Sequence, residues 1–158
     1  MKPTVYFDAT IPNYLFDERE SLATFVEITN KWWQQEGVNF DIWISEETLN
    51  ELAAGRYPHK SKALEFASKL TVLPPDESIV EIAQIYLDNY VMPQVLKGDA
   101  IHLAYASFYK IDFLLTWNCN HLANANKRRH IRRINTRLNL PIPDIVTPLE
   151  LFKEQSYD

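Results

Sequence analysis

The sequence VYFDATIPNYL, residues 5–15, begins with a short run that is typical of a buried β-strand. Val5, Tyr6 and Phe7 are β-branched or aromatic and carry no charge, a composition that favours strands. The run ends directly on a carboxylate, Asp8. A strand that ends on an acidic residue can present it at the rim of a sheet, or the carboxylate can cap the turn that follows. The residues alone leave both interpretations open.

Outward from this first strand, the chain alternates between strand and helix patterns. Strands are expected at residues 4–8, 40–45, 70–73, 112–117 and 144–146. Helices are expected at 22–35, 46–54, 61–68, 76–90, 99–109, across the basic segment 127–137, and from 147, where a capping box precedes the run. Such alternation requires crossover connections, which produce a mainly parallel sheet covered on both faces. The sequence therefore predicts a three-layer α/β fold with a central sheet of four to five strands, in one domain spanning residues 1–158.

The composition excludes several classes of protein. With 46% hydrophobic and 23% charged residues among 158, the chain is typical of soluble globular proteins. The single cysteine, Cys119, excludes an internal disulfide and suits a reducing compartment. No apolar run approaches the ~20 residues of a membrane span, and the first strand occupies the place of a signal peptide's apolar region. We therefore expect a cytoplasmic protein. Three glycines in all leave no Gly-rich loop for nucleotide binding of the P-loop or Rossmann kind.

Acidic and polar residues fall where a parallel sheet gathers its ligands, outside the carboxyl ends of its strands. The candidates are Asp8, Glu51, Asp99, Thr116, Asn118 and Asn120. Clustered carboxylates repel one another unless a divalent cation neutralises them, and Mg²⁺ or Mn²⁺ prefers such oxygen ligands. Each carboxylate also has a structural interpretation. Asp99 would be favourable in a first helical turn, and Glu51 would lie on a solvated helix face. His102 is interpreted as a surface or packing histidine and not as a ligand.

Four segments resemble, in family order, the PIN-domain proteins and in particular the VapC-like ribonuclease toxins of prokaryotic toxin–antitoxin pairs. The segments are VYFDAT at 5–10, ISEETLNELAAG at 44–55, KGDAIHLAYA at 97–106 and FLLTWNCNHLANA at 113–125. Together they span nearly the whole chain. The resemblance implies a metal-dependent endoribonuclease with RNA as its substrate and a small antitoxin as its partner. It leaves a homodimer open.

The resemblance also assigns roles to site residues. Asp8, Glu51 and Asp99 match the family's acidic ligands for Mg²⁺ or Mn²⁺, and Thr116 matches the hydroxyl residue after the fourth strand. Where the family often has T-x-D, this chain has Thr116-Trp117-Asn118. Because Asn118 offers an oxygen but no charge, we expect a weakened second metal site and one tightly held ion.

A basic segment, KRRHIRRINTR at residues 127–137, stands out from an acidic chain. The net charge is −5, and without the six cations of this segment the remainder carries −11. The segment can be a solvated surface, a docking surface for an acidic part of the antitoxin, or a track for the RNA backbone. The candidate RNA-binding residues are Lys127, Arg128, Arg129, Arg132 and Arg133.

Two other functions are compatible with parts of this pattern. A phosphatase of the haloacid-dehalogenase type also begins with a strand-terminal Asp, but its D-x-D pattern fails here because Thr10 occupies the third position. Its later acidic pair is missing as well, since Leu103 stands four residues after Asp99. A degenerate PIN fold that binds RNA or a partner without cleavage is the stronger rival, because Asn118 has lost the family's charge.

Overall fold

The central sheet carries the site, and all of its strands are parallel. The computed structural model describes residues 1–89, 91, 97–118, 122 and 125–153. The strands are β1 (Thr4–Phe7), β2 (Asp41–Ile44), β3 (Thr71–Val72), β4 (Phe113–Leu115) and β5 (Asp144–Val146). They pair in the order β3-β2-β1-β4-β5, with β1 in the middle.

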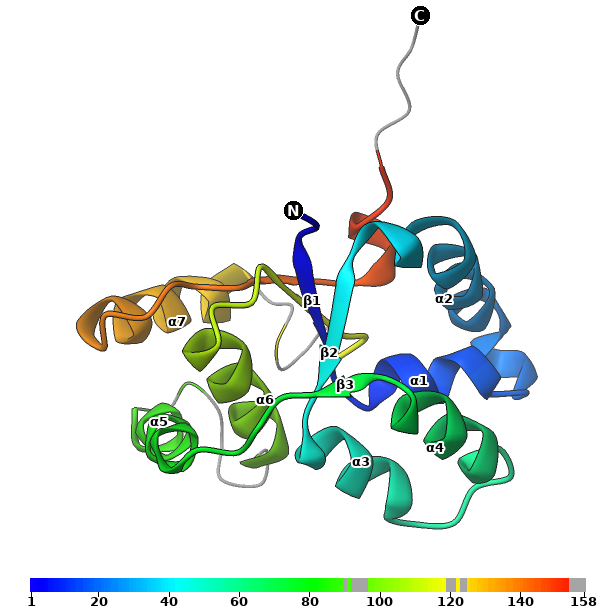
Figure 1. Cartoon of the computed structure of the whole chain (residues 1–158), viewed down its shortest axis with the longest axis horizontal. Coiled ribbons are helices and arrows are strands. Elements are labelled where there is room, and N and C mark those ends of the chain that lie inside the picture. Colours follow the sequence, from blue (N-terminus) through cyan, green and yellow to red (C-terminus); the bar gives the residue numbers. More distant parts are fainter. Residues whose placement is uncertain (90, 92–96, 119–121, 123–124, 154–158) are drawn as a thin grey trace, which may run out of the picture.

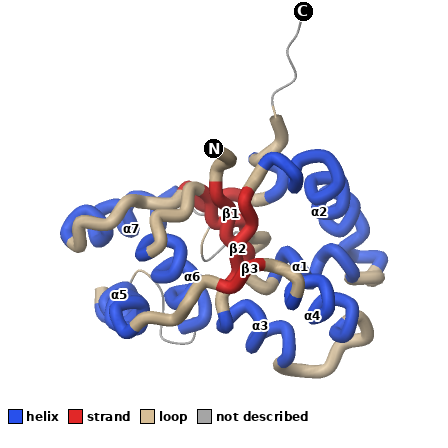
Figure 2. The backbone as a smooth tube through the Cα atoms, viewed as in Figure 1, coloured by secondary structure: helices blue, strands red, loops and turns tan. Residues whose placement is uncertain are grey.

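Helices cover both faces of this sheet (Figures 1 and 2). The α-helices are α1 (Thr10–Phe16), α2 (Ala23–Glu36), α3 (Glu46–Ala53), α4 (Lys60–Ser68), α5 (Glu77–Asp88), α6 (Lys97–Phe108) and α7 (Ala125–Arg137). Short 3-10 turns are η1 (Glu20–Leu22), η2 (Gly37–Asn39) and η4 (Pro148–Glu150). Helices α5, α6 and α7 lie on one face, and α1, α2 and α4 lie on the other (Figure 1). The predicted three-layer α/β fold is confirmed.

The uncharged first strand is explained by burial on both faces. Successive side chains of a strand point to opposite faces, so Tyr6 packs into the core formed with α5, α6 and α7. Val5 and Phe7 pack into the second core, with Ile11 and Trp32. All three strand residues are fully buried, as expected for the central strand of a parallel sheet.

The order in which strands are added to the sheet reverses at β1. From β1 the sheet grows through β2 to β3 on one side, and β4 and β5 are added on the other side. Ligand sites of parallel sheets lie at such a switch point. Since Phe7 is paired with Leu115, the next residues, Asp8 and Thr116, leave the two strands side by side.

Helix α1 was not predicted. Pro12 and Asn13 favour a turn in the sequence, yet Pro12 is only the third residue of α1, where proline costs no intrahelical hydrogen bond. Most other predicted elements differ from the structure by one to three residues at their ends, which is the ordinary uncertainty of boundaries. The capping box at Thr147 and Glu150 is present, although it begins a 3-10 turn and not an α-helix. None of the described helices has the length and apolar character needed to cross a membrane.

Candidate active site

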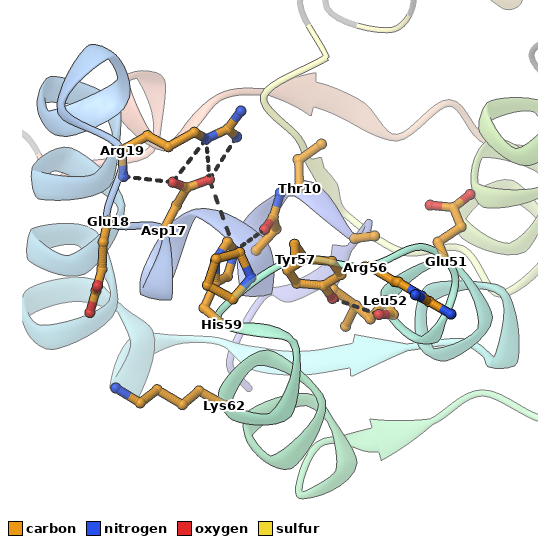
Figure 3. Close-up of a pocket in the computed structure, with 13 residues that line it drawn as sticks. Thr10, Asp17, Glu18, Arg19, Glu51, Leu52, Arg56, Tyr57, His59 and Lys62 are labelled. Carbon is orange, nitrogen blue, oxygen red and sulfur yellow. Dashed lines mark hydrogen bonds and ion pairs between the residues drawn. The ribbon is translucent and has the colours of Figure 1, made fainter.

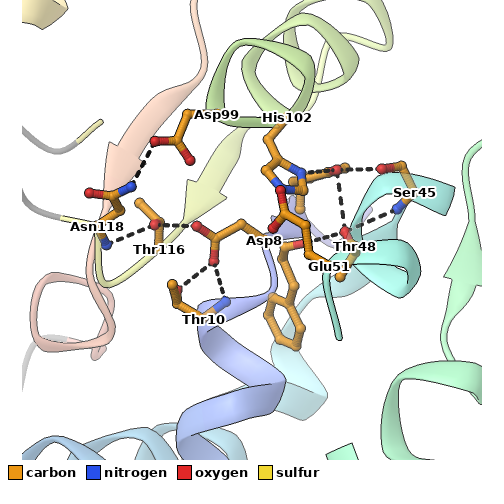
Figure 4. A network of polar contacts seen from close by, with 11 residues as sticks. Asp8, Thr10, Ser45, Thr48, Glu51, Asp99, His102, Thr116 and Asn118 are labelled. Carbon is orange, nitrogen blue, oxygen red and sulfur yellow. Dashed lines mark hydrogen bonds and ion pairs between the residues drawn. The ribbon is translucent and has the colours of Figure 1, made fainter. Parts of the chain in front are cut away.

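Asp8 lies at the end of β1 and is only 2% exposed. Its Oδ1 accepts hydrogen bonds from the backbone nitrogen of Thr10, at 3.0 Å, and from the Thr10 hydroxyl. Its Oδ2 accepts a hydrogen bond from Thr116 Oγ1, at 2.5 Å (Figure 4). One oxygen therefore holds the turn into α1, while the other faces the candidate site.

Burial raises the pKa of Asp8 from 3.8 to about 6. The charge of His102 and the hydrogen bonds from Thr10 and Thr116 lower it, and the nearby charge of Asp99 raises it further. A buried carboxylate with a raised pKa lacks enough positive charge around it. The site therefore favours a proton or a cation at Asp8.

A chain of hydrogen bonds connects Asp8 to Asp99. Thr116 is fully buried, and its hydroxyl accepts from the backbone nitrogen of Asn118 at 2.9 Å. The side-chain amide of Asn118 then donates to Asp99 Oδ2 at 2.7 Å (Figure 4). Asp99 lies in the first turn of α6, as predicted. The structure thus brings four of the predicted residues together, while Asn120 and Cys119 lie outside the described residues.

Glu51 approaches the cluster from α3. Its side chain is 35% exposed and lies 3.1 Å from His102 Nε2, an ion-pair distance without hydrogen-bond geometry. A Cβ atom at position 98 would overlap Glu51 Oε1, so Gly98 allows this approach. Glu51 is therefore half-buried between α3 and α6, and its interpretation as a solvated residue is only partly right.

His102 is fully buried, as the packing interpretation expected, but sequence reasoning did not place it beside the candidate carboxylates. Its Nδ1 lies 2.6 Å from the hydroxyl of Tyr6, which also contacts Ser45 Oγ at 2.6 Å. Its place three residues after Asp99, on the same side of α6, was the available signal.

The charge of His102 is set by opposing effects. Burial lowers its pKa, but Tyr6, Glu51 and Asp8 together raise it well above 6.5. A protonated His102 would lie between two of the candidate carboxylates.

The model of the PIN domain family matches residues 5–125, which is most of the chain. The chain belongs to the PIN domain family. No curated protein sequence is detectably similar to it.

Solved structures share the fold of this PIN domain at low sequence identity. A toxin–antitoxin complex from Klebsiella pneumoniae has a TM-score of 0.59 and 20% identity, with 92% of this chain and 98% of that chain covered. VapBC2 from Rickettsia felis, bound to a DNA fragment from its promoter, has a TM-score of 0.57 and 14% identity, with 91% and 98% covered. VapBC-1 from nontypeable Haemophilus influenzae has a TM-score of 0.56 and 19% identity, with 92% and 98% covered.

The donor set of this PIN domain suits a hard cation held by few carboxylates. Among the described residues, no group of three or more His, Cys, Asp or Glu side chains is arranged to hold a metal. Asp8 and Asp99 are nevertheless close enough to repel, and Asp8 Oδ2 accepts only one hydrogen bond from the described residues. Mg²⁺ is commonly held by one or two carboxylates with water in its other positions. The residues fit such an ion better than a three-carboxylate cage.

Helix α7 of this PIN domain places most of its cations outward. Ile131 and Ile134 are buried against the core, and the opposite side of the helix exposes Arg129, Arg132 and Arg133. These three arginines form no salt bridge with a described residue. The predicted basic helix is therefore present, and its body lies beyond the matched residues 5–125.

Two other cations of α7 are engaged within the protein. Lys127 is half-buried, and its Nζ donates to the carbonyl oxygen of Val91 at 2.8 Å. Arg128 Nη2 lies 3.9 Å from Glu150 Oε2. Of the five candidate RNA-binding residues, Arg129, Arg132 and Arg133 are therefore the ones most available to a partner.

Proposed function

We propose that this PIN domain is a metal-dependent endoribonuclease of the VapC-like toxin kind, which an antitoxin neutralises. The observation that supports it most is the convergence of Asp8, Thr116 and Asp99 at the switch point of the sheet. The shared fold with toxin–antitoxin complexes supports the partner.

Each residue then has a role that follows from its contacts. Asp8 and Asp99 would hold Mg²⁺ or Mn²⁺, and the Thr116 hydroxyl orients the Asp8 carboxylate. Glu51, held beside His102, orients the attacking water or supports a second ion. A bound divalent ion polarises the scissile phosphate and lowers the pKa of its water.

Incubation of the purified, partner-free protein with total RNA tests the proposal. Cleavage is expected with Mg²⁺ or Mn²⁺ and none with EDTA. If no divalent ion supports cleavage, the nuclease assignment is wrong.

A binding module without nuclease activity is the second candidate. It is favoured by Asn118, whose amide group occupies an oxygen of Asp99 that a metal would otherwise use. This alternative would be supported if the wild type binds RNA but does not cleave it, whichever divalent ion is added.

Restoring a carboxylate at position 118 is expected to change the metal response. In Asn118→Asp, the 2.7 Å hydrogen bond to Asp99 becomes a contact between two like charges. The metal-free protein should lose roughly 1–3 kcal/mol of stability, whereas cleavage at low Mg²⁺ should increase. Thermal unfolding in EDTA and a Mg²⁺ titration of cleavage measure the two effects.

The matched control for this prediction is Asn118→Ala. It removes the same hydrogen bond without adding a charge, so it should lose stability but gain no activity. Unchanged or lower activity of Asn118→Asp across the whole titration would place residue 118 away from the metal.

Neutralising the outward face of α7 is expected to weaken RNA binding for all sequences. For single-stranded RNA, a plot of log affinity against log salt concentration falls with a slope of ~0.7 for each phosphate contact. Arg129→Gln/Arg133→Gln should therefore flatten that slope by about 1 to 1.5. The exposed pair Lys31→Gln/Lys69→Gln, in α2 and directly after α4, is the charge-matched control. An unaltered slope would assign α7 to ordinary solvated surface.

A further inference from the structure

A cavity of about 780 Å³ lies between α1 and the segment that joins α3 to α4, residues 54–59 (Figure 3). Thr10 and Glu51 form part of its wall, and Thr10 also donates to Asp8. The cavity therefore borders the candidate active site directly. Its volume lies within the ~300–1,000 Å³ of pockets that hold small molecules.

The segment 54–59 is shaped to present side chains to this cavity. Gly55 has a positive φ of 77°, a conformation that other residues adopt at a cost, and its carbonyl accepts from Lys60 Nζ at 3.0 Å. Tyr57 Oη donates to the carbonyl oxygen of Leu52 at 2.5 Å. Both contacts fix the turn that places Arg56 and Tyr57 on the wall.

The cations of the wall are available to an anion. Arg56 and Lys62 are exposed and form no salt bridge with any residue the structure describes. The buried carboxylate of Asp17 is already neutralised by Arg19, and this hydrogen-bonded ion pair lowers the pKa of Asp17. The exposed Glu18 lies across the cavity from Arg56 (Figure 3). The three cations of the wall are matched in number by its three carboxylates, Asp17, Glu18 and Glu51, but Arg56 is not held in an ion pair with any of them and is therefore available to a phosphate.

Aromatic and amide groups line the same cavity. The rings of Tyr57 and His59 pack edge to face, with centroids 4.8 Å apart, and His59 Nε2 hydrogen-bonds the Asn13 side-chain oxygen. The Asn13 amide nitrogen makes no hydrogen bond with a described residue. A planar ring and a hydrogen-bond donor are the groups that hold an unpaired base.

We propose that this cavity binds one unpaired nucleotide of the RNA substrate, next to the phosphate that is cleaved. The inference rests on the proposed function and adds where the strand lies beside the acidic site. Because consecutive nucleotides are covalently joined, a strand bound at the carboxylates brings its next nucleotide to a cavity that shares Glu51. Arg56 contacts the phosphate of this nucleotide, Tyr57 stacks on its base, and Asn13 donates to an acceptor on the base edge.

Equilibrium binding of an end-labelled single-stranded RNA, in EDTA so that no metal-dependent cleavage occurs, tests this proposal. Tyr57→Leu should bind roughly fivefold or more weakly, because base stacking is lost. Tyr57→Phe keeps the ring but loses the hydrogen bond to Leu52, so it should bind more tightly than Tyr57→Leu. Arg56→Gln should flatten the salt slope by ~0.7. Lys69 is an exposed cation outside the cavity, so Lys69→Gln is the control for the loss of one positive charge. Its effect on affinity and salt slope should be smaller than that of Arg56→Gln. Melting temperatures establish that each variant is folded.

An RNA with a single abasic residue gives the decisive measurement. The Tyr57 ring contacts the base if two results are found. The abasic RNA should bind the wild type as weakly as intact RNA binds Tyr57→Leu, and the abasic RNA should bind Tyr57→Leu no more weakly than that. If Tyr57→Leu and Arg56→Gln bind RNA as the wild type does, the cavity serves another ligand, such as a protein partner, and the proposal is wrong. Since binding is measured without cleavage, a wild type that binds in this way but cuts no RNA would overturn the nuclease proposal alone.

Discussion

Asp8→Asn is expected to lower RNA cleavage by roughly 100-fold or more, the usual effect of removing one group that stabilises charge in a transition state. The same substitution should remove most of the thermal stabilisation by Mn²⁺. An ion that binds only the native state contributes about 2.7 kcal/mol at 100 times its Kd. Asn is nearly isosteric and keeps an oxygen for Thr10, so the turn into α1 should persist.

The matched control is Asp41→Asn. Asp41 is exposed and begins β2, the neighbour of β1, so it lies at the opposite end of the strands from Asp8. This variant should cleave RNA and respond to Mn²⁺ like the wild type. An equal shift of the melting temperature by Mn²⁺ in Asp8→Asn and wild type would show that the ion binds elsewhere.

The part of the site that could be predicted is the part encoded locally. An uncharged run followed by Asp8 is visible within a few residues, and the alternation of elements predicts a parallel sheet whose strand ends gather ligands. That Asp8 and Thr116 are side by side depends on the register of β1 with β4, which joins residues 108 apart. The pattern included Glu51 among the candidates but favoured a solvated helix face for it, and the resemblance to PIN domains gave it the role of a metal ligand.

The residues that could not be predicted depend on distant partners. His102 contacts Tyr6, which lies 96 residues away in the sequence, so its spacing from Asp99 could indicate a shared side of the helix but not its contacts in the site. Glu51 is half-buried because Gly98 lacks a side chain at the point of contact. Lys127, which belongs to the basic segment, turns inward to Val91. Charge patterning identifies such a segment, but only packing decides which of its cations are free.

Asp8 also gives a prediction for stability in the absence of metal. Its pKa is about 6 in the folded protein and 3.8 ordinarily, so the folded state holds the proton more tightly. The resulting stability is present in full below pH ~4 and is lost as the pH rises through 6. A shift of about two pKa units corresponds to about 3 kcal/mol, at 1.36 kcal/mol per unit.

The neighbouring titrations change stability mainly outside the range from pH ~4 to 6.5. The raised pKa of His102 provides stability that is present in full below pH 6.5 and declines as the pH rises from there through the higher pKa of the folded state. The lowered pKa of Asp17 provides stability that is present above 3.8 and lost as the pH falls below it. A change between pH ~4 and 6.5 is therefore attributable mainly to Asp8.

In EDTA, the wild type should lose about 3 kcal/mol more unfolding free energy than Asp8→Asn between pH 4 and pH 7 to 8, because residue 8 cannot ionise in the variant. Above pH 7 the metal-free variant should thus be the more stable protein. Saturating Mn²⁺ should reverse the order, because only the wild type gains the binding energy of the ion. Urea unfolding at a series of pH values, with and without Mn²⁺, measures both effects. Parallel pH profiles of wild type and Asp8→Asn in EDTA would mean that burial does not perturb this carboxylate, and the electrostatic case for a cation beside it would fail.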